Sequence, residues 1–146
     1  MNTTTPLPGV DLGDAAKAVR SLLDVVLDAQ DVTFAEWVAL RTLGVAVPGR
    51  VSQPALRDGV VLALDLDATQ ATALLCALEG RGLLSYDGFE QVGLTPEGTA
   101  LFDEIQGGVA AITAEVYGGI DAGELATTRR VLASVAARAT ELRARL

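Results

Sequence analysis

The sequence predicts a mainly helical chain with one small two-stranded hairpin, and three observations support this fold class. Apolar residues recur every three or four positions in several long stretches, as they do on the buried face of a helix. Asp87-Gly88, between two short β-type runs, is typical of a tight hairpin turn with positive φ angles. Capping boxes mark three helix starts, at Thr33 with Glu36, Asp67 with Gln70, and Asp121 with Glu124.

The first third of the chain predicts an arm and two helices. Residues 1–13 are polar and rich in threonine and proline, so we expect a flexible arm. Residues 14–29 carry a wide apolar stripe and predict a helix of about four turns. The capping box at Thr33 opens a shorter helix with Trp37 inside, and residues 44–50, which include Pro48-Gly49, predict a loop.

Residues 53–64 can be interpreted in two ways. Ser52 is a suitable N-cap for a helix that buries Leu56 and Val60. The run that follows Asp58-Gly59 is also compatible with a hairpin and a buried strand, because periodicity cannot separate the two in a short apolar segment. The order of the elements favours the helix. Asp65 then occupies the turn, as a residue that tolerates the left-handed conformation better than most.

The stretch from Asp67 to Pro96 organises the rest of the chain. It predicts a helix that ends at Gly80 and Gly82, strands over 83–86 and 89–94, and a new helix that Thr95 caps and Pro96 begins. That helix runs from residue 97 to 117, and Gly107-Gly108 in its middle predicts a bend or a close contact. A last helix covers residues 125–146.

Composition limits the possible functions. Half of the 146 residues are apolar, and no stretch is long enough for a membrane span or resembles a signal peptide, so we expect a cytoplasmic protein without membrane contacts. The chain has one cysteine and no histidine, so we expect no metal site, no cofactor and no enzymatic activity. The net charge is −8, and residues 31–95 hold four arginines against eight acidic residues.

Two motifs carry a resemblance to a known family. Leu78-Glu79-Gly80-Arg81-Gly82-Leu83 and, after the hairpin, Leu94-Thr95-Pro96-Glu97-Gly98 resemble the motifs that flank the wing of the MarR family of winged helix-turn-helix transcriptional regulators. The motif-bearing part covers residues 56–98, and the order of elements matches over nearly the whole chain. The resemblance implies a winged helix-turn-helix head over 31–96, dimerisation helices over 14–30 and 97–146, and one MarR-like domain over 14–146.

The resemblance also implies a DNA-binding surface on the helix that begins after Asp67. Its first turns would enter the major groove, where Thr69, Gln70 and Thr72 would face bases and phosphates. Ser52 and Gln53 would offer backbone N–H groups to a phosphate. The alternative is that these are ordinary solvated residues near helix N-termini. Two departures from the family weaken the expected binding: the hairpin lacks a cation, and Ala73 and Ala77 stand where relatives often have arginine.

Relatives bind small aromatic or amphipathic effectors between the head and the dimer helices. Here the resemblance implies a pocket built from Trp37, Arg41 and Phe102, with the guanidinium as a carboxylate anchor; alternatively the two rings belong to the core. Cys76 lies beside the outward face of the helix that begins after Asp67, which would be the recognition helix. Its oxidation could release DNA, but no Lys or His lies nearby to activate the thiol, and the alternative is an inert small residue.

The sequence leads to three functional hypotheses. The first is a homodimeric, ligand-responsive regulator of transcription that binds double-stranded DNA weakly and takes a small aromatic or acidic effector. The second is a protein of the same fold that has lost DNA binding and acts as a ligand-binding or protein-interaction module. The third, more remote, is a fold adapted for catalysis. The alternative to a dimer is a monomer whose apolar helices fold back on the head.

Overall fold

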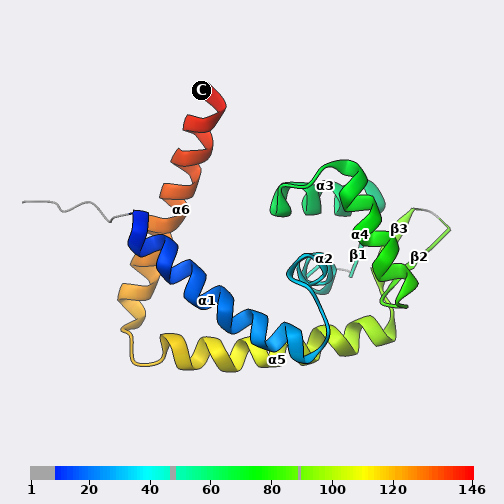
Figure 1. Cartoon of the computed structure of the whole chain (residues 1–146), viewed down its shortest axis with the longest axis horizontal. Helices are drawn as coiled ribbons and strands as arrows, with labels where there is room; N and C mark the ends of the chain where they lie inside the picture. Colours follow the sequence, from blue (N-terminus) through cyan, green and yellow to red (C-terminus); the bar gives the residue numbers. More distant parts are fainter. Residues whose placement is uncertain (1–8, 47–48, 89) are drawn as a thin grey trace, which may run out of the picture. The chain divides into compact units, whose positions relative to one another are not determined.

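Six helices and three short strands make up the described part of the chain, residues 9–46, 49–88 and 90–146 of a computed structural model (Figure 1). The fold class predicted from the sequence, mainly helical with a small antiparallel wing, is confirmed. The elements are α1 Gly9–Ala29, α2 Phe34–Gly44, β1 Arg50–Ser52, α3 Gln53–Leu64, α4 Ala68–Gly80, β2 Leu84–Tyr86, β3 Gln91–Leu94, α5 Pro96–Tyr117 and α6 Ala122–Arg145.

The chain divides into two compact units, Met1–Ile112 and Thr113–Leu146. The first holds α1 to β3 and most of α5, and the second holds the end of α5 and all of α6. The single domain expected over 14–146 therefore stays a prediction.

The arm expected over residues 1–13 is corrected in part. Helix α1 begins at Gly9, so 9–13 are helical, while 1–8 lie outside the described residues. The buried side of α1 is narrower than the predicted stripe. Leu27 is the buried residue, with Leu23 and Val26 packed partly against the core, and this i, i+3, i+4 spacing is that of one helix face.

The helix starts follow the predicted capping residues. Thr33 Oγ1 accepts from Glu36 N at 3.1 Å and Glu36 Oε1 accepts from Thr33 N at 3.1 Å, which completes the box at α2. The box of Asp67 and Gln70 at α4 is also complete, with distances of 2.7 and 3.0 Å. At α6 the structure has one arm of the predicted box, the bond from Glu124 N to Asp121 Oδ2 at 3.1 Å.

The ambiguous segment 53–64 is helical, so the hairpin alternative is wrong. Ser52 caps α3 by accepting from Ala55 N at 3.2 Å, and Leu56 and Val60 are fully buried. Asp65 ends the helix in the left-handed conformation, at φ 54° and ψ 41°, as the sequence predicted.

The wing has three strands where the sequence predicted two. Strand β1 begins at Arg50, the last residue of the expected loop 44–50, and ends at Ser52. It pairs antiparallel with β3, which pairs with β2 on its other edge. The predicted positive φ angles at Asp87-Gly88 are wrong, because the described residue of this loop with positive φ is Glu90, at 63°. Phe89, expected to begin the second strand, lies outside the described residues; β3 starts at Gln91.

A single core holds the first unit together. Its fully buried members come from α1 to α5 and from the sheet, and include Leu27, Leu40, Leu43, Leu56, Val60, Leu78, Val92 and Ile105. Helix α5 packs closely against this core. A Cβ added at Gly108 would lie 2.8 Å from Val26 Cγ1 of α1, so Gly108 is the close-packing point predicted at Gly107-Gly108.

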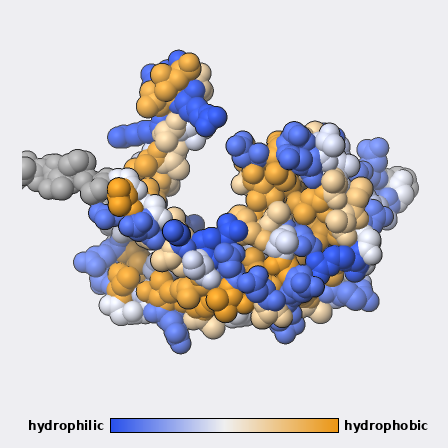
Figure 2. All heavy atoms as spheres, in the orientation of Figure 1, coloured by the Kyte–Doolittle hydropathy of each residue, from blue (hydrophilic) through white to orange (hydrophobic). Residues whose placement is uncertain are grey.

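Helix α6 contrasts with the core helices because none of its residues is buried. Val131, Val135 and Leu142 recur along one face and are 46%, 45% and 52% exposed. In Figure 2, α6 shows apolar atoms next to hydrophilic ones on the visible face. Helix α6 therefore has an apolar face that its own unit leaves exposed.

Candidate nucleic-acid interface

Helix α4 presents its polar residues to solvent, as the sequence predicted. Thr69, Gln70 and Thr72 are exposed, and so are Ala73 and Cys76. The opposite face holds the helix in place through Ala71, Leu75 and Leu78, which are at most 2% exposed. The three candidate base-contacting residues therefore lie on the outward side of a well-anchored helix.

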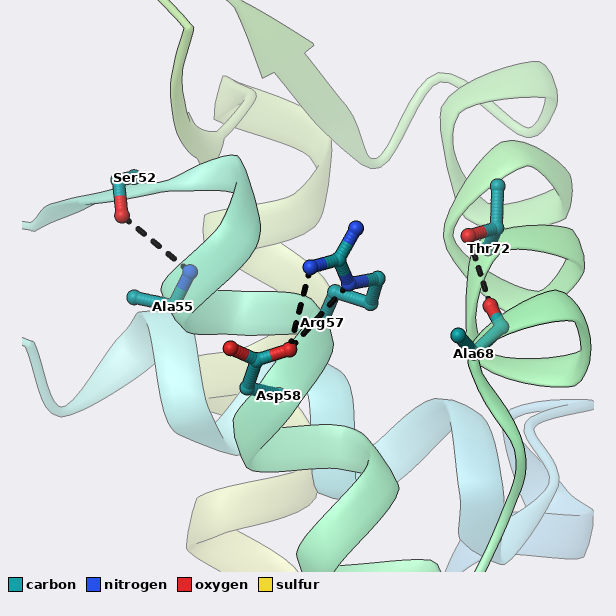
Figure 3. A network of polar contacts seen from close by, with 6 residues as sticks. All are labelled: Ser52, Ala55, Arg57, Asp58, Ala68 and Thr72. Atoms are coloured by element: carbon teal, nitrogen blue, oxygen red, sulfur yellow. Dashed lines mark hydrogen bonds and ion pairs between the residues drawn. The ribbon is translucent and has the colours of Figure 1, made fainter.

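Two of these three side chains already have hydrogen-bond partners. Gln70 Oε1 accepts from the backbone N–H of Asp67 in the capping box, at 3.0 Å. Thr72 Oγ1 donates to the carbonyl oxygen of Ala68 at 2.8 Å (Figure 3). A glutamine needs both its oxygen and its nitrogen to read adenine bidentately, so this reading would require the box to open. The Gln70 amide N–H groups and the Thr72 lone pairs remain for a ligand.

The N-terminus of α3 differs from the expected phosphate site. The N–H of Gln53 donates to the carbonyl oxygen of Glu90 at 2.9 Å, which ties the wing loop to the helix. Pro54 has no N–H, and the N–H of Ala55 donates to Ser52 Oγ (Figure 3). The backbone N–H of Gln53 is therefore already bonded within the chain, while the phosphate contact expected at Ser52 and Gln53 stays a prediction. The exposed side-chain amide of Gln53 is what remains for a phosphate.

A cleft of about 200 Å³ lies between α3, α4 and the wing, and we call it the α3–α4 cleft. It brings Gln53 and Thr72 together, while Thr69 and Gln70 lie outside it. Three of its side chains, Arg57, Tyr86 and Glu90, were not predicted as site residues. Tyr86 and Glu90 belong to the wing, which strand pairing rather than local sequence brings to α3. Its full lining is Gln53, Pro54, Arg57, Thr72, Leu75, Cys76, Tyr86 and Glu90.

Tyr86 is a residue of the α3–α4 cleft whose pKa is shifted. Burial raises the pKa of its phenol above the usual value, and the charges of Glu79 and Cys76 raise it further. Tyr86 is therefore a neutral hydroxyl at physiological pH, able to donate and accept hydrogen bonds. Cys76 lies in the same cleft with an exposed free thiol.

The positive charge of the head, residues 31–96, is largely neutralised by its own carboxylates. Arg57 pairs with Asp58 at 3.3 Å (Figure 3) and Arg50 pairs with Asp87 at 3.8 Å. Arg81 pairs with Glu36. Among the described residues, Arg41 has no ion pair. Since cations that neutralise phosphates supply most non-specific DNA affinity, few are available here.

The residues expected to build an effector pocket are only partly assembled. Trp37 and Phe102 stack with ring centroids 5.7 Å apart and planes inclined by 20°. Trp37 is 3% exposed, and a Cβ added at Gly44 would lie 2.5 Å from the Phe102 ring, so the rings fill the space between α2 and α5. Arg41 is exposed. These residues line neither the α3–α4 cleft nor four other cavities of the described residues, and the effector pocket stays a prediction.

In residues 9–46, 49–88 and 90–146, no group of three or more histidine, cysteine, aspartate or glutamate residues is arranged to hold a metal ion. Within the same residues, no single helix is both long and apolar enough to cross a membrane.

Comparison with known proteins identifies solved structures that are similar to this chain. No protein-family model and no curated protein matches the chain. The structure of transcriptional regulator PA3341 is 25% identical, with a TM-score of 0.74 over 91% of this chain and 98% of that one. NadR in complex with 4-hydroxyphenylacetate is 21% identical, with a TM-score of 0.72 over 91% and 97%. A MarR-family transcriptional regulator from Rhodococcus sp. RHA1 is 22% identical, with a TM-score of 0.68 over 90% and 96%.

Proposed function

We propose, from the MarR-type winged helix-turn-helix fold that this chain shares with these structures, that the protein is a homodimeric regulator of transcription that binds DNA in the cytoplasm. The observation that carries the proposal is the anchoring of α4. Its core face is fully packed, while Thr69, Gln70 and Thr72 point to solvent. A rigid helix with an outward polar N-terminal half is what the major groove accepts.

The uncovered apolar face of α6 supports a homodimer. No residue of α6 is buried, and a second copy of the chain offers an apolar surface of the same kind. Val135→Asp on this face should shift the protein to monomer in sedimentation or light scattering. Ala137→Asp, on the opposite face of the same helix, is the matched control and should leave the dimer intact. A monomeric wild-type protein would contradict the proposal.

A dimer would present two α4 helices to successive major grooves about 34 Å apart. An effector that changes this spacing would lower DNA affinity, because only one of the two helices could then engage fully. NadR, one of the similar structures, holds 4-hydroxyphenylacetate. For this chain we propose a small aromatic acid, with Arg41 as the carboxylate anchor and Trp37 and Phe102 as the apolar wall.

The acidic character of the head limits the strength of binding. Three of its four arginines are paired with carboxylates, and the N–H groups at the start of α3 are already bonded. With few phosphate contacts, we expect weak binding. We also expect a shallow slope in a plot of log affinity against log salt concentration, because each contact contributes only about −0.9 to that slope. Sequence selection then depends mainly on the α4 side chains.

A mobility-shift titration tests the proposed function. Labelled duplex from the region upstream of the protein's own gene is titrated with dimer at low salt, with unlabelled random-sequence duplex as competitor. We expect a shift at micromolar dimer that the competitor removes less effectively than the specific duplex. No shift under these conditions would overturn the proposal.

The second candidate, a protein of this fold without DNA binding, is favoured by one specific observation. Glu90 lines the α3–α4 cleft, and its carbonyl group also occupies the N–H of Gln53. A carboxylate at this place would repel a phosphate. If this candidate is correct, the mobility shift is absent, while a small aromatic acid still raises the melting temperature of the dimer.

A further inference from the structure

Arg81 follows α4 directly and joins its end to a distant part of the head. The guanidinium Nη1 donates to Glu36 Oε2 of α2, and Nη2 donates to the carbonyl oxygen of Asp31 at 3.1 Å. Asp31 lies in the turn between α1 and α2, in the left-handed conformation with φ 56°. One planar group therefore holds two elements that precede it by 45 and 50 residues.

Glu36 serves this contact and the start of α2 at once. Its Oε1 accepts from Thr33 N in the capping box, and its Oε2 accepts from Arg81. Its side chain is only 12% exposed, compared with 38% for Arg81, so water competes weakly for the carboxylate. The next residue, Trp37, stacks on Phe102 of α5. The end of α4 is thus linked to the same turn of α2 that packs against α5.

We propose that Arg81 is a positioning residue that couples the orientation of α4 to the α1–α2 junction. The inference rests on the proposed function, since α4 is the helix that would enter the groove. Thr69 lies about 18 Å from Arg81 along the helix. A small change of tilt at the Arg81 end therefore moves the DNA-facing end by an ångström or more. Movement of α1 or α2, on dimerisation or effector binding, reaches α4 through this contact.

The competing role for Arg81 is direct contact with a DNA phosphate. The two roles predict opposite effects for Glu36→Gln. Glutamine preserves the capping box, but its one oxygen is then used by Thr33 N, and its NH₂ group faces the guanidinium. The variant breaks the contact with Arg81 and removes a negative charge. A positioning role predicts weaker DNA binding, whereas a phosphate contact predicts tighter binding because Arg81 is freed.

Hydrogen exchange tests the coupling without DNA. In Arg81→Gln and Glu36→Gln we expect faster exchange both in the last turn of α4 and in the α1–α2 turn. Arg50→Gln removes an arginine of similar exposure that pairs with Asp87, and is the control that should leave both segments unchanged. Faster exchange in only one of the two segments, or in neither, would overturn the coupling.

DNA affinity then tests what the coupling does. Fluorescence anisotropy is measured with the upstream duplex, at a temperature where unfolding curves show every variant fully folded. We expect Glu36→Gln and Arg81→Lys each to bind on the order of tenfold more weakly than wild type, because a lysine ammonium cannot bridge Glu36 and Asp31. Affinity equal to or above that of wild type in either variant would refute the positioning role. If the wild-type protein itself did not bind the duplex, the proposed function would be refuted. Hydrogen exchange would still show whether Arg81 couples α4 to the α1–α2 turn.

Discussion

Gly98, in the first turn of α5, lies directly against the backbone of Leu83. A Cβ added at Gly98 would overlap the carbonyl oxygen of Leu83 and come within 3.1 Å of its carbonyl carbon. Thr95 strengthens the same contact: its N–H donates to Leu83 O at 3.1 Å, and its hydroxyl donates to Gly82 O at 2.5 Å. The two motifs that carry the family resemblance therefore meet each other in space.

Gly98→Ala should be strongly destabilising. The methyl group would meet backbone atoms, which cannot move aside like a flexible side chain, so we expect a loss of about 3 kcal/mol or more in the free energy of unfolding. Urea denaturation followed by circular dichroism measures this loss. Gly80→Ala is the control, because a Cβ at Gly80 meets no atom within 4 Å. Equal stability of the two variants would contradict the close contact.

Substitution by alanine should have opposite effects on stability at Gly107 and Gly108 of α5. A Cβ at Gly107 meets nothing within 4 Å, so Gly107→Ala should stabilise the helix by about 1 kcal/mol through propensity. A Cβ at Gly108 would lie 2.8 Å from Val26 Cγ1, and valine is stiff at χ1, so Gly108→Ala should destabilise by about 1–2 kcal/mol.

The contact between Gly108 and Val26 is checked by chemical denaturation of Gly108→Ala, of Val26→Ala and of the double variant. Val26→Ala removes the methyl groups that the new Cβ would meet. It should therefore lower the free energy of unfolding less in the Gly108→Ala background than in the wild type. Additive effects of the two substitutions would show that α1 and α5 do not approach each other at this point.

Most of the helices could be predicted from the sequence because their signals are local. A capping box joins residues three apart, so Thr33 with Glu36 and Asp67 with Gln70 are visible in the sequence itself. Asp65 in the left-handed conformation is equally local. The outward position of Thr69, Gln70 and Thr72 on α4 agrees with the sequence for a similar reason, because the period of a helix fixes which residues share a face.

The missed features depend on contacts between distant parts of the chain. Strand β1 has three residues and exists because Val51 pairs with Val92, which no local pattern reveals. The same pairing places Glu90 where its carbonyl oxygen accepts from the N–H of Gln53, so this N–H group is bonded within the chain. Arg81 was recognised as part of a motif, but its partners lie 45 and 50 residues away.

Asp58→Asn should strengthen DNA binding by releasing Arg57. The ion pair is exposed, with 71% of the Asp58 side chain accessible, so the substitution should cost little stability. The freed guanidinium lies in the α3–α4 cleft, and a new phosphate contact would steepen the salt dependence of log affinity by about 0.9. Anisotropy titrations at several salt concentrations measure this slope. Asp65→Asn removes the same charge at the other end of α3 and frees no arginine; an identical gain in both variants would indicate a general charge effect.

Gln70→Glu separates the capping role of this residue from its role in DNA recognition. Glutamate at this position still accepts from Asp67 N, so the free energy of unfolding should change by less than about 0.5 kcal/mol. It has no amide donors and adds a negative charge to the outward face of α4, so affinity for the upstream duplex should fall at least tenfold if Gln70 faces the groove. Gln70→Ala loses the cap as well, and should lower both stability and affinity. Unchanged affinity in Gln70→Glu would mean that Gln70 only caps the helix, and base contact would then rest on Thr69 and Thr72.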